Sequence, residues 1–244
     1  MTPLAPAMPP LRLSVEDFQR WGALWLGEAN PETGQAKAAA SFDRQQSVNF
    51  ASFIDEAFAN ALATMLGGLP VERARSDLLV PPVPDCVEIG AVRIIGGIRP
   101  QNFDVAYRPD GVRVAFDSKT LNDLKSVGKN WQNMVNDLAT EAATVHTRFP
   151  YAVVVFMVVI PRPALGLKQE TDIVRTLERL GSRRDVLDQL HLAEAIALVA
   201  WDPKTGELDA ITPASSSNLR VEKLPGALYQ HYLSRYKGLP PHDA

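Results

Sequence analysis

Cysteine is almost absent from this chain: Cys86 is the only one among 244 residues, so no internal disulfide can form. A lone thiol is typical of proteins in a reducing compartment, and we expect a cytoplasmic location. Histidine is also scarce, and its scattered positions (146, 191, 231 and 242) predict no zinc site. The sequence contains no Walker loop, no internal repeat and no constellation around a Cys or Ser nucleophile, which argues against those classes of protein.

Long apolar runs are missing as well. The most apolar stretch, Tyr151–Ile160, is about half of the roughly 20 residues that a membrane-spanning helix needs, so no membrane partner is expected. The N-terminus is rich in proline and alanine without the basic start of a signal peptide, and residues 1–12 are predicted to be a disordered leader. With a flexible tail expected at 238–244, residues 13–237 are predicted to form a single domain.

Apolar spacing predicts alternating helices and strands through the middle of the chain. Helical periodicity is found over 45–66, 130–147 and 172–192, and strand patterns are found over 87–98, 102–120, 151–160 and 195–201. The run Val153–Val159 is apolar at every position, which is typical of a strand covered on both faces.

The most informative stretch is a predicted hairpin with Arg-Pro-Asp-Gly at its turn (108–111). Proline and glycine in these positions favour a tight turn, and polar and apolar residues alternate on both sides of it. If the first and last turn residues pair, Asp104 lies opposite Ala115 and on the same face as Asp117 and Lys119. Two carboxylates and one ammonium group would then converge at one end of the hairpin.

This trio of side chains suits metal-dependent phosphate chemistry. Mg²⁺ binds through one or two carboxylates and takes water and substrate phosphate at its other positions. A nearby lysine can orient or deprotonate the attacking water and offset charge on the scissile phosphate. Asp104 and Asp117 are therefore the predicted Mg²⁺ ligands, and Lys119 is the predicted catalytic lysine.

The pattern Asp104…Asp117-Ser-Lys119 resembles the PD-(D/E)xK nuclease superfamily, which includes most type II restriction endonucleases. Asp104 matches the first acidic position of the motif, and Asp117 and Lys119 match its second acid and its lysine. The literal Pro109-Asp110 lies in the predicted turn, too close to Asp117 to belong to the partner strand. The resemblance implies an α/β fold with a restriction-endonuclease-like αβββαβ core, in which helices flank a mixed central sheet, over about residues 45–201.

Auxiliary site residues are expected on two helices of this core. Some members of the superfamily carry a metal-linked carboxylate on the first helix, where Glu56 is the candidate and Asp55 is the competing choice. At the start of the second helix, Lys129 and Gln132 are predicted substrate contacts, because donors at a helix N-terminus favour anions. Asn130 is the predicted N-cap of that helix.

A net charge of −3 argues against nucleic-acid binding, but phosphate contacts need local rather than overall positive charge. The donor-rich loop Ser215–Arg220 either reads DNA, with Arg220 as a substrate contact, or is a plain connector. Basic residues cluster in three groups: Lys119, Lys125 and Lys129; Arg175, Arg179, Arg183 and Arg184; and Arg220, Lys223, Arg235 and Lys237.

These observations predict a Mg²⁺-dependent endonuclease that hydrolyses DNA phosphodiester bonds. A type II restriction endonuclease that cuts a specific duplex site is the leading interpretation, and the resemblance then implies a homodimer on a palindromic site. A repair or mobile-element nuclease of the same fold and a non-catalytic nucleic-acid-binding domain stay open as alternatives. Double-stranded DNA is the expected partner.

Overall fold

The computed structural model describes residues 3–27, 41–75, 78–124 and 127–242. Its helices are α1 (Val15–Leu26), α2 (Arg44–Met65), α3 (Val127–Arg148), α4 (Leu167–Leu180) and α5 (Leu224–Tyr236), with short 3-10 turns at Arg162–Ala164 and Val221–Lys223. Its strands are β1 (Val71–Arg73), β2 (Val87–Ile95), β3 (Pro100–Tyr107), β4 (Val114–Thr120), β5 (Val153–Pro161) and β6 (Ala195–Trp201).

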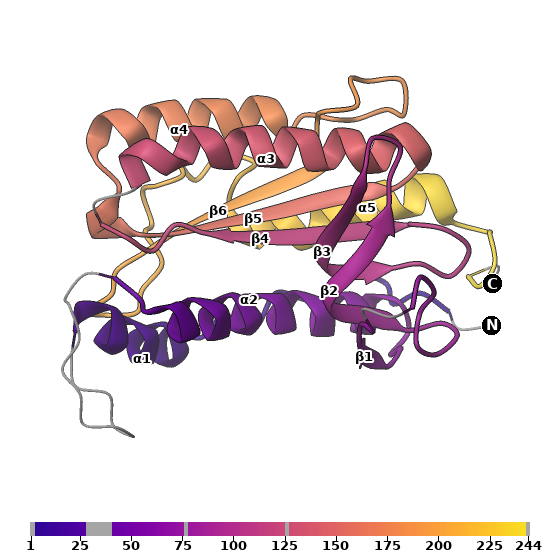
Figure 1. The fold of residues 1–244 in the computed structure, drawn as a ribbon, viewed down its shortest axis with the longest axis horizontal. Coiled ribbons are helices and arrows are strands. Elements are labelled where there is room, and N and C mark those ends of the chain that lie inside the picture. The colour runs from indigo at the N-terminus through magenta and orange to yellow at the C-terminus, as the bar shows by residue number, and fades with distance from the viewer. Residues whose placement is uncertain (1–2, 28–40, 76–77, 125–126, 243–244) are drawn as a thin grey trace.

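The strands form one six-stranded mixed sheet whose order follows the sequence from β1 to β6. Strand β3 pairs antiparallel with both β2 and β4. The pairs β1–β2, β4–β5 and β5–β6 are parallel. Helices α2 and α5 pack on one face of the sheet, and α3 and α4 pack on the other (Figure 1). The predicted α/β fold with a mixed sheet flanked by helices is confirmed.

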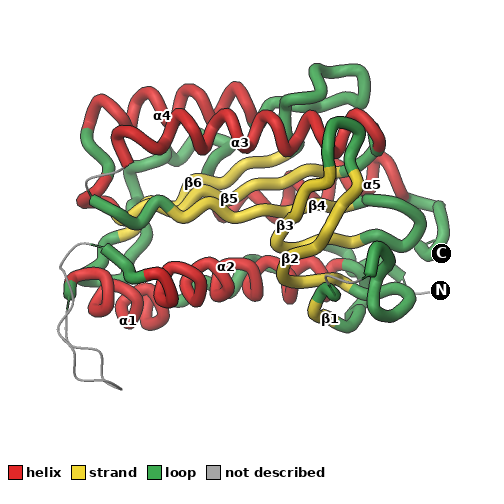
Figure 2. The backbone as a smooth tube through the Cα atoms, viewed as in Figure 1, coloured by secondary structure: helices red, strands yellow, loops and turns green. Residues whose placement is uncertain are grey.

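Strand β5 lies within the core, and all nine of its residues are buried, as its apolar run predicts. Successive side chains point to opposite faces of a strand. Val155 and Met157 therefore join the apolar cluster under α2 and α5, while Phe156 and Val158 join the cluster under α3 and α4. Figure 2 shows the strands in yellow between these two helical layers.

Two predicted helix boundaries are wrong. Helix α3 begins at Val127, so Asn130 lies inside it and is not its N-cap. Helix α4 ends at Leu180 instead of continuing to residue 192, because Gly181 follows it and the chain then turns. In that turn, the Asp188 carboxylate accepts backbone N–H bonds that a longer helix would use internally.

The described parts of both end segments pack on the domain, although their composition predicted a disordered leader and a flexible tail. At the N-terminal end Met8 is buried, and the Ala5 amide donates a hydrogen bond to the Met65 carbonyl. At the C-terminal end His242 is buried, with its ring 6.2 Å from that of Tyr107. Apolar contacts and single backbone bonds thus order these proline-rich stretches without regular secondary structure.

The pairing of β3 with β4 differs from the predicted register. Val105 lies opposite Phe116, and Ala115 lies opposite Ala106 instead of the predicted Asp104. The observed register is therefore shifted by two positions from the predicted one. A shift of two keeps every side chain on its predicted face, because strand side chains alternate with period two. Asp104 and Asp117 therefore share a face, as predicted, and they lie closer together than expected.

Arg113 accounts for the longer connection between these strands. Its amide donates to the Tyr107 carbonyl, while its buried guanidinium pairs with Asp110 and lies 4.7 Å from the ring centroid of Tyr236. These contacts hold Arg113 directly before β4, so residues 108–113 connect the two strands where a tight turn at 108–111 was predicted.

Strands β3 and β4 pair only through Val105–Tyr107. The rest of β3 stays paired with β2, and this hairpin rises out of the sheet toward α3 (Figure 1). At its tip, the Gly97 amide donates to the Thr144 carbonyl of α3 at 2.8 Å. The separation leaves one edge of β4 unpaired by β3 from Asp117 onward, and we call this place the fork.

Candidate active site

Asp104 lies at the fork, where its side chain replaces a backbone hydrogen bond that β4 would otherwise form with β3. Its carboxylate accepts a hydrogen bond from the Ser118 amide of β4 at 2.8 Å and lies 3.3 Å from the Ser118 hydroxyl. Because β3 no longer supplies a carbonyl to this amide, the Asp104 side chain completes the backbone bonding of β4. The carboxylate is thereby fixed beside the face that carries Asp117.

Asp117 and Lys119 lie two residues apart on β4, on the side of the sheet that faces α3. The Lys119 ammonium donates to the Asp117 carboxylate and, at 3.0 Å, to Glu141 of α3. The side chain of Asp117 is 8% exposed and that of Lys119 is 24% exposed, so the lysine side chain can be reached from solvent while the neighbouring acid is nearly covered.

A third aspartate approaches the fork from the other side of the sheet. Asp55 projects from α2 and is buried, and it interacts with Ser118 and with the charge of Asp104. Its neighbour Glu56 is exposed. Of the two candidate carboxylates on this helix, Asp55 therefore lies at the site and the predicted Glu56 does not.

Crowding of these acids in a poorly hydrated place changes their titration. Burial, followed by the neighbouring Asp117, raises the pKa of Asp104 to about 8. Burial and the charge of Asp104 likewise raise the pKa of Asp55 to about 8. Burial raises the pKa of Asp117 to about 6, although Asp104 and Lys119 oppose this shift. Such shifts on adjacent acids are typical of sites that bind cations or transfer protons.

Lys119 responds in the opposite way. Burial alone would lower the pKa of its ammonium group, but the charges of Asp117 and Glu141 outweigh burial and raise the pKa above its ordinary value. Lys119 is therefore a cation at neutral pH. A fixed ammonium group can stabilise negative charge that develops on a neighbouring phosphate.

The donors at the fork fit Mg²⁺. They are carboxylate oxygens, and Asp55 Oδ1 and Glu141 Oε2 are buried without a hydrogen-bond partner among the residues that the structure describes. The same part of the chain contains no group of three or more His, Cys, Asp or Glu residues arranged to hold a metal. Mg²⁺ does not require such a cage, because it is usually held by one or two carboxylates together with water and phosphate.

The predicted substrate contacts fall in two different environments. Lys129 and Gln132 are exposed on the first turns of α3, where a ligand can reach them. Lys125 of the same predicted cluster lies outside the described residues. Arg220 is bound within its own loop, donating to the carbonyls of Asp209 at 2.9 Å and Pro213 at 3.2 Å.

Arg220 also forms an ion pair with Glu222, and the neighbouring Lys223 donates to the Ser216 carbonyl. These contacts explain the cations of this loop as supports of its backbone. Between the two readings of the Ser215–Arg220 loop, the geometry favours the connector.

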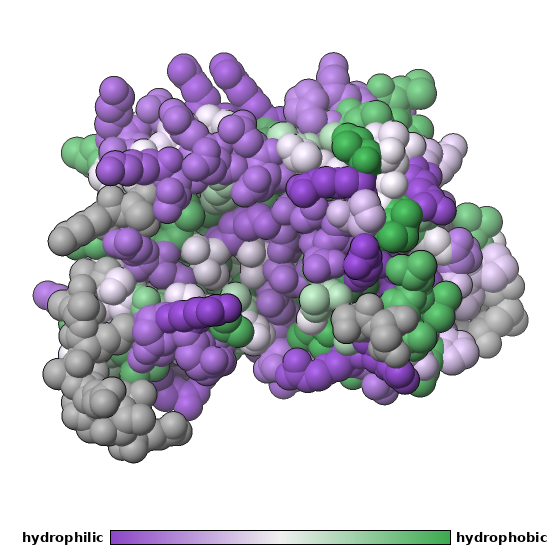
Figure 3. Space-filling model, viewed as in Figure 1, coloured by the Kyte–Doolittle hydropathy of each residue, from purple (hydrophilic) through white to green (hydrophobic). Residues whose placement is uncertain are grey.

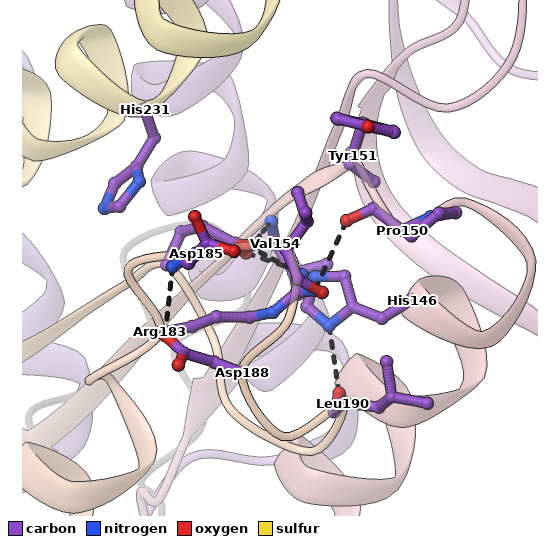
Figure 4. Close-up of polar contacts among 12 residues, drawn as sticks. His146, Pro150, Tyr151, Val154, Arg183, Asp185, Asp188, Leu190 and His231 are labelled. Atoms are coloured by element: carbon purple, nitrogen blue, oxygen red, sulfur yellow. Dashed lines mark hydrogen bonds and ion pairs between the residues drawn. The ribbon is translucent and has the colours of Figure 1, made fainter.

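A second polar cluster, at the start of β6, is a structural feature rather than a site. Glu194 lies 3.2 Å from His146 and 2.9 Å from both Arg183 and Arg235, and it accepts the Val154 amide at 2.7 Å. Figure 4 shows Arg183 and His146 reaching into this cluster from different segments. Because His146, Arg183 and Glu194 are fully buried, no substrate can reach them, and Arg183 does not belong to the predicted basic surface.

Figure 3 shows hydrophilic side chains over much of the layer formed by α3 and α4, while apolar side chains gather at the right of this view, in the region of the loop before β2. Leu79, Val80 and Val83 of that loop are exposed, and Val80 and Val83 help to line a cavity of about 610 Å³ with Pro109. Its lining residues do not include the acids of the fork. No helix of the described residues is both long and apolar enough to cross a membrane.

The sequence interpretation missed Glu141, Ser118 and Gln101, the last of which donates a hydrogen bond from β3 to Glu141 at 3.1 Å. Glu141 carried a usable signal, because it lies on the apolar stripe that Met134, Leu138 and Val145 form along α3, where a carboxylate is out of place. Ser118 was invisible as a site residue, since its role depends on its backbone amide.

No family model matches the chain, and no match was found among curated proteins or solved structures. The function of the chain is therefore inferred from the residues and geometry of the fork.

Proposed function

We propose that this protein is a Mg²⁺-dependent endonuclease that hydrolyses DNA phosphodiester bonds. In this proposal α2, β2, β3, β4, α3 and β5 form a restriction-endonuclease-like core. The observation that carries it is the fork, where Asp104 and Asp117 of neighbouring strands lie side by side next to the ammonium group of Lys119.

Asp104 and Asp117 would hold the metal ion. Two adjacent acids with raised pKa values are costly to ionise together, and a bound divalent cation removes that cost. When bound there, Mg²⁺ would supply Lewis acidity and a more acidic water molecule. Ser118 fixes the orientation of Asp104 through its amide, so one ligand is already in place before the ion arrives.

Lys119 acts on the phosphate and the attacking water. Its ammonium group is held at the fork and its side chain is partly exposed, so it can offset the charge that builds up on a scissile phosphate. We assign contacts with the flanking DNA backbone to Lys129 and Gln132, which are exposed at the start of α3. These roles need only local positive charge, and a net charge of −3 is compatible with them.

Among nucleases with such a core, we propose a type II restriction endonuclease that acts as a homodimer on duplex DNA. A repair or mobile-element nuclease would use the same residues of the fork, so the form of the DNA decides between them. The test is to incubate the full chain with supercoiled plasmid, sequence-diverse linear duplexes, branched DNA and single strands, in Mg²⁺ or in EDTA.

Discrete fragments of the linear duplexes in Mg²⁺, with a dimeric mass in solution, are the result that a restriction enzyme gives. Cleavage confined to branched or single-stranded DNA would replace restriction by repair. Binding without cleavage in Mg²⁺ or Mn²⁺ would identify a non-catalytic binding domain and would overturn the proposed activity.

A further inference from the structure

Glu141 is a carboxylate in a position that packing alone would give to an apolar residue. It is 4% exposed on α3, between Leu138 and Ala142, which belong to the apolar cluster under the helix. Burying a carboxylate is unfavourable unless charged or polar partners compensate for its lost hydration. A buried ion pair is weak evidence for stability, because replacing the whole pair by apolar side chains of similar size is often neutral or stabilising. Stability is therefore not a sufficient reason for a glutamate here.

The partners of Glu141 connect three elements. Its Oε1 atom accepts a hydrogen bond from Lys119 Nζ of β4 at 3.0 Å and another from Gln101 Nε2 of β3 at 3.1 Å. Glu141 thus reaches across the fork from α3 and contacts both of the strands that separate there.

We propose that Glu141 is a positioning residue of the active site, which holds the Lys119 ammonium group over the fork, and that Gln101 fixes Glu141 in turn. This inference rests on the proposed nuclease function. A lysine has a flexible four-carbon stem and needs more than one anchor to keep its charge in place. Asp117 is one anchor, but in the proposed function it also binds the metal, and Glu141 is the anchor that remains available.

A close contact between the β2–β3 hairpin and α3 sets the distance between Gln101 and Glu141. Gly96 and Gly97, at the tip of the β2–β3 hairpin, pack directly on α3. A Cβ atom built on either glycine would come within 2.3 Å of the methyl group of Thr144 or Thr147, respectively. The absence of these side chains lets the hairpin approach the helix closely. Glu141 lies about one helical turn before Thr144 on α3, and the contact at the hairpin tip holds Gln101 of β3 opposite it.

The test compares Glu141→Met and Glu141→Gln with the wild type in single-turnover cleavage at saturating DNA, together with DNA affinity and thermal stability. We expect Glu141→Met to remain folded and to bind DNA normally, but to cleave about 10- to 100-fold more slowly, which is the range found when a residue that orients a metal ligand is removed. Glu141→Gln should be intermediate, because its amide oxygen can still accept from Lys119. Asp137→Asn, an exposed change one turn away on the same helix, is the matched control and should cleave normally.

Gln101→Ala provides an internal check. If Gln101 acts through Glu141, its loss should slow cleavage in the wild type and have little further effect in Glu141→Met. Independent, multiplying effects of the two changes would overturn the chain of contacts that we propose.

A second readout does not depend on cleavage. Acetylation of the full-length, metal-free protein, followed by mass spectrometry, compares Lys119 with the exposed Lys129. Lys119 should be protected in the wild type and several-fold more reactive in Glu141→Met. Unchanged reactivity, or a Glu141→Met enzyme as fast as the wild type, would refute the positioning role. A wild-type protein that cleaves no nucleic acid but shows the change in reactivity would overturn the proposed function and leave the contact between Glu141 and Lys119 established.

Discussion

Replacing Asp104 with asparagine is expected to stabilise the metal-free protein at alkaline pH. Burial and the neighbouring Asp117 raise the pKa of Asp104 from 3.8 to about 8. Between these two pH values the folded protein keeps a proton that the unfolded chain has released, so folding stability falls as the pH rises through this window. Asparagine has no charge to lose, and its side-chain oxygen can still accept the bond from the Ser118 amide.

The size of the effect depends on the shift in pKa. One pKa unit corresponds to about 1.4 kcal/mol, so a shift of about four units sets an upper limit of roughly 6 kcal/mol. Because Asp104, Asp117 and Asp55 interact, removing one carboxylate also eases ionisation of the other two, and the gain is divided among them. We expect a net gain of about 2 to 3 kcal/mol near pH 8, or roughly 4 to 12 °C in Tm for a chain of this size.

The assay is thermal and urea unfolding of wild type and Asp104→Asn in EDTA, from about pH 4.5 to about pH 8, which covers most of the window between the ordinary pKa of 3.8 and the shifted pKa of about 8. The stability difference should be small at the acid end and grow with pH. Mg²⁺ should raise the Tm of the wild type and leave that of Asp104→Asn almost unchanged, because a ligand stabilises only the form that binds it. Glu56→Gln removes an exposed charge from the same region and is the control. An Asp104→Asn protein that is less stable at pH 8, or a difference that does not change with pH, would refute this description of the site.

Three other substitutions test the remaining assignments. Asp55→Asn should slow Mg²⁺-dependent cleavage at least tenfold, because Asp55 interacts with the predicted metal ligand Asp104 and loss of such an outer partner has about this effect. Glu56→Gln should cleave normally, and equal rates for the two variants would remove Asp55 from the site. Glu194→Gln should lose about 3 to 5 kcal/mol in urea unfolding, because it leaves buried Arg183 without its counter-ion, and a loss below about 1 kcal/mol would show that the cluster is not needed for stability. Arg220→Ala should leave both the DNA affinity and its salt dependence unchanged, since Arg220 is bound to its own loop, and a reduced salt slope would restore it as a phosphate contact.

Much of the architecture was predictable because it depends on strong local patterns. The apolar run of β5 and the helical spacing of α2 predicted boundaries within two residues of those in the structure. The face shared by Asp104 and Asp117 was also correct despite the wrong register, since a shift of two positions preserves the alternation of a strand.

The features that could not be predicted depend on contacts between distant segments. At the fork the β2–β3 hairpin leaves β4 and packs against α3. The sequence of β3 alone does not show where its pairing with β4 ends. The choice between Asp55 and Glu56 depends on the rotation of α2 over the sheet, and a one-residue difference in a helix turns a side chain by about 100°. Glu141 lies 22 residues after its partner Lys119, and only the packing of α3 brings them together.

The decisive test of a metal-dependent nuclease at the fork is single-turnover cleavage of duplex DNA by the wild type, Asp104→Ala, Asp117→Ala and Lys119→Ala over a Mg²⁺ titration, with Asp137→Asn as the control. We predict that the wild type and the control cleave in Mg²⁺ and not in EDTA, and that both aspartate variants are inactive although folded. Lys119→Ala should cleave about 10²- to 10⁴-fold more slowly with a similar dependence on Mg²⁺. Wild-type rates from Asp104→Ala or Asp117→Ala, or cleavage that persists in EDTA, would contradict this assignment of the fork.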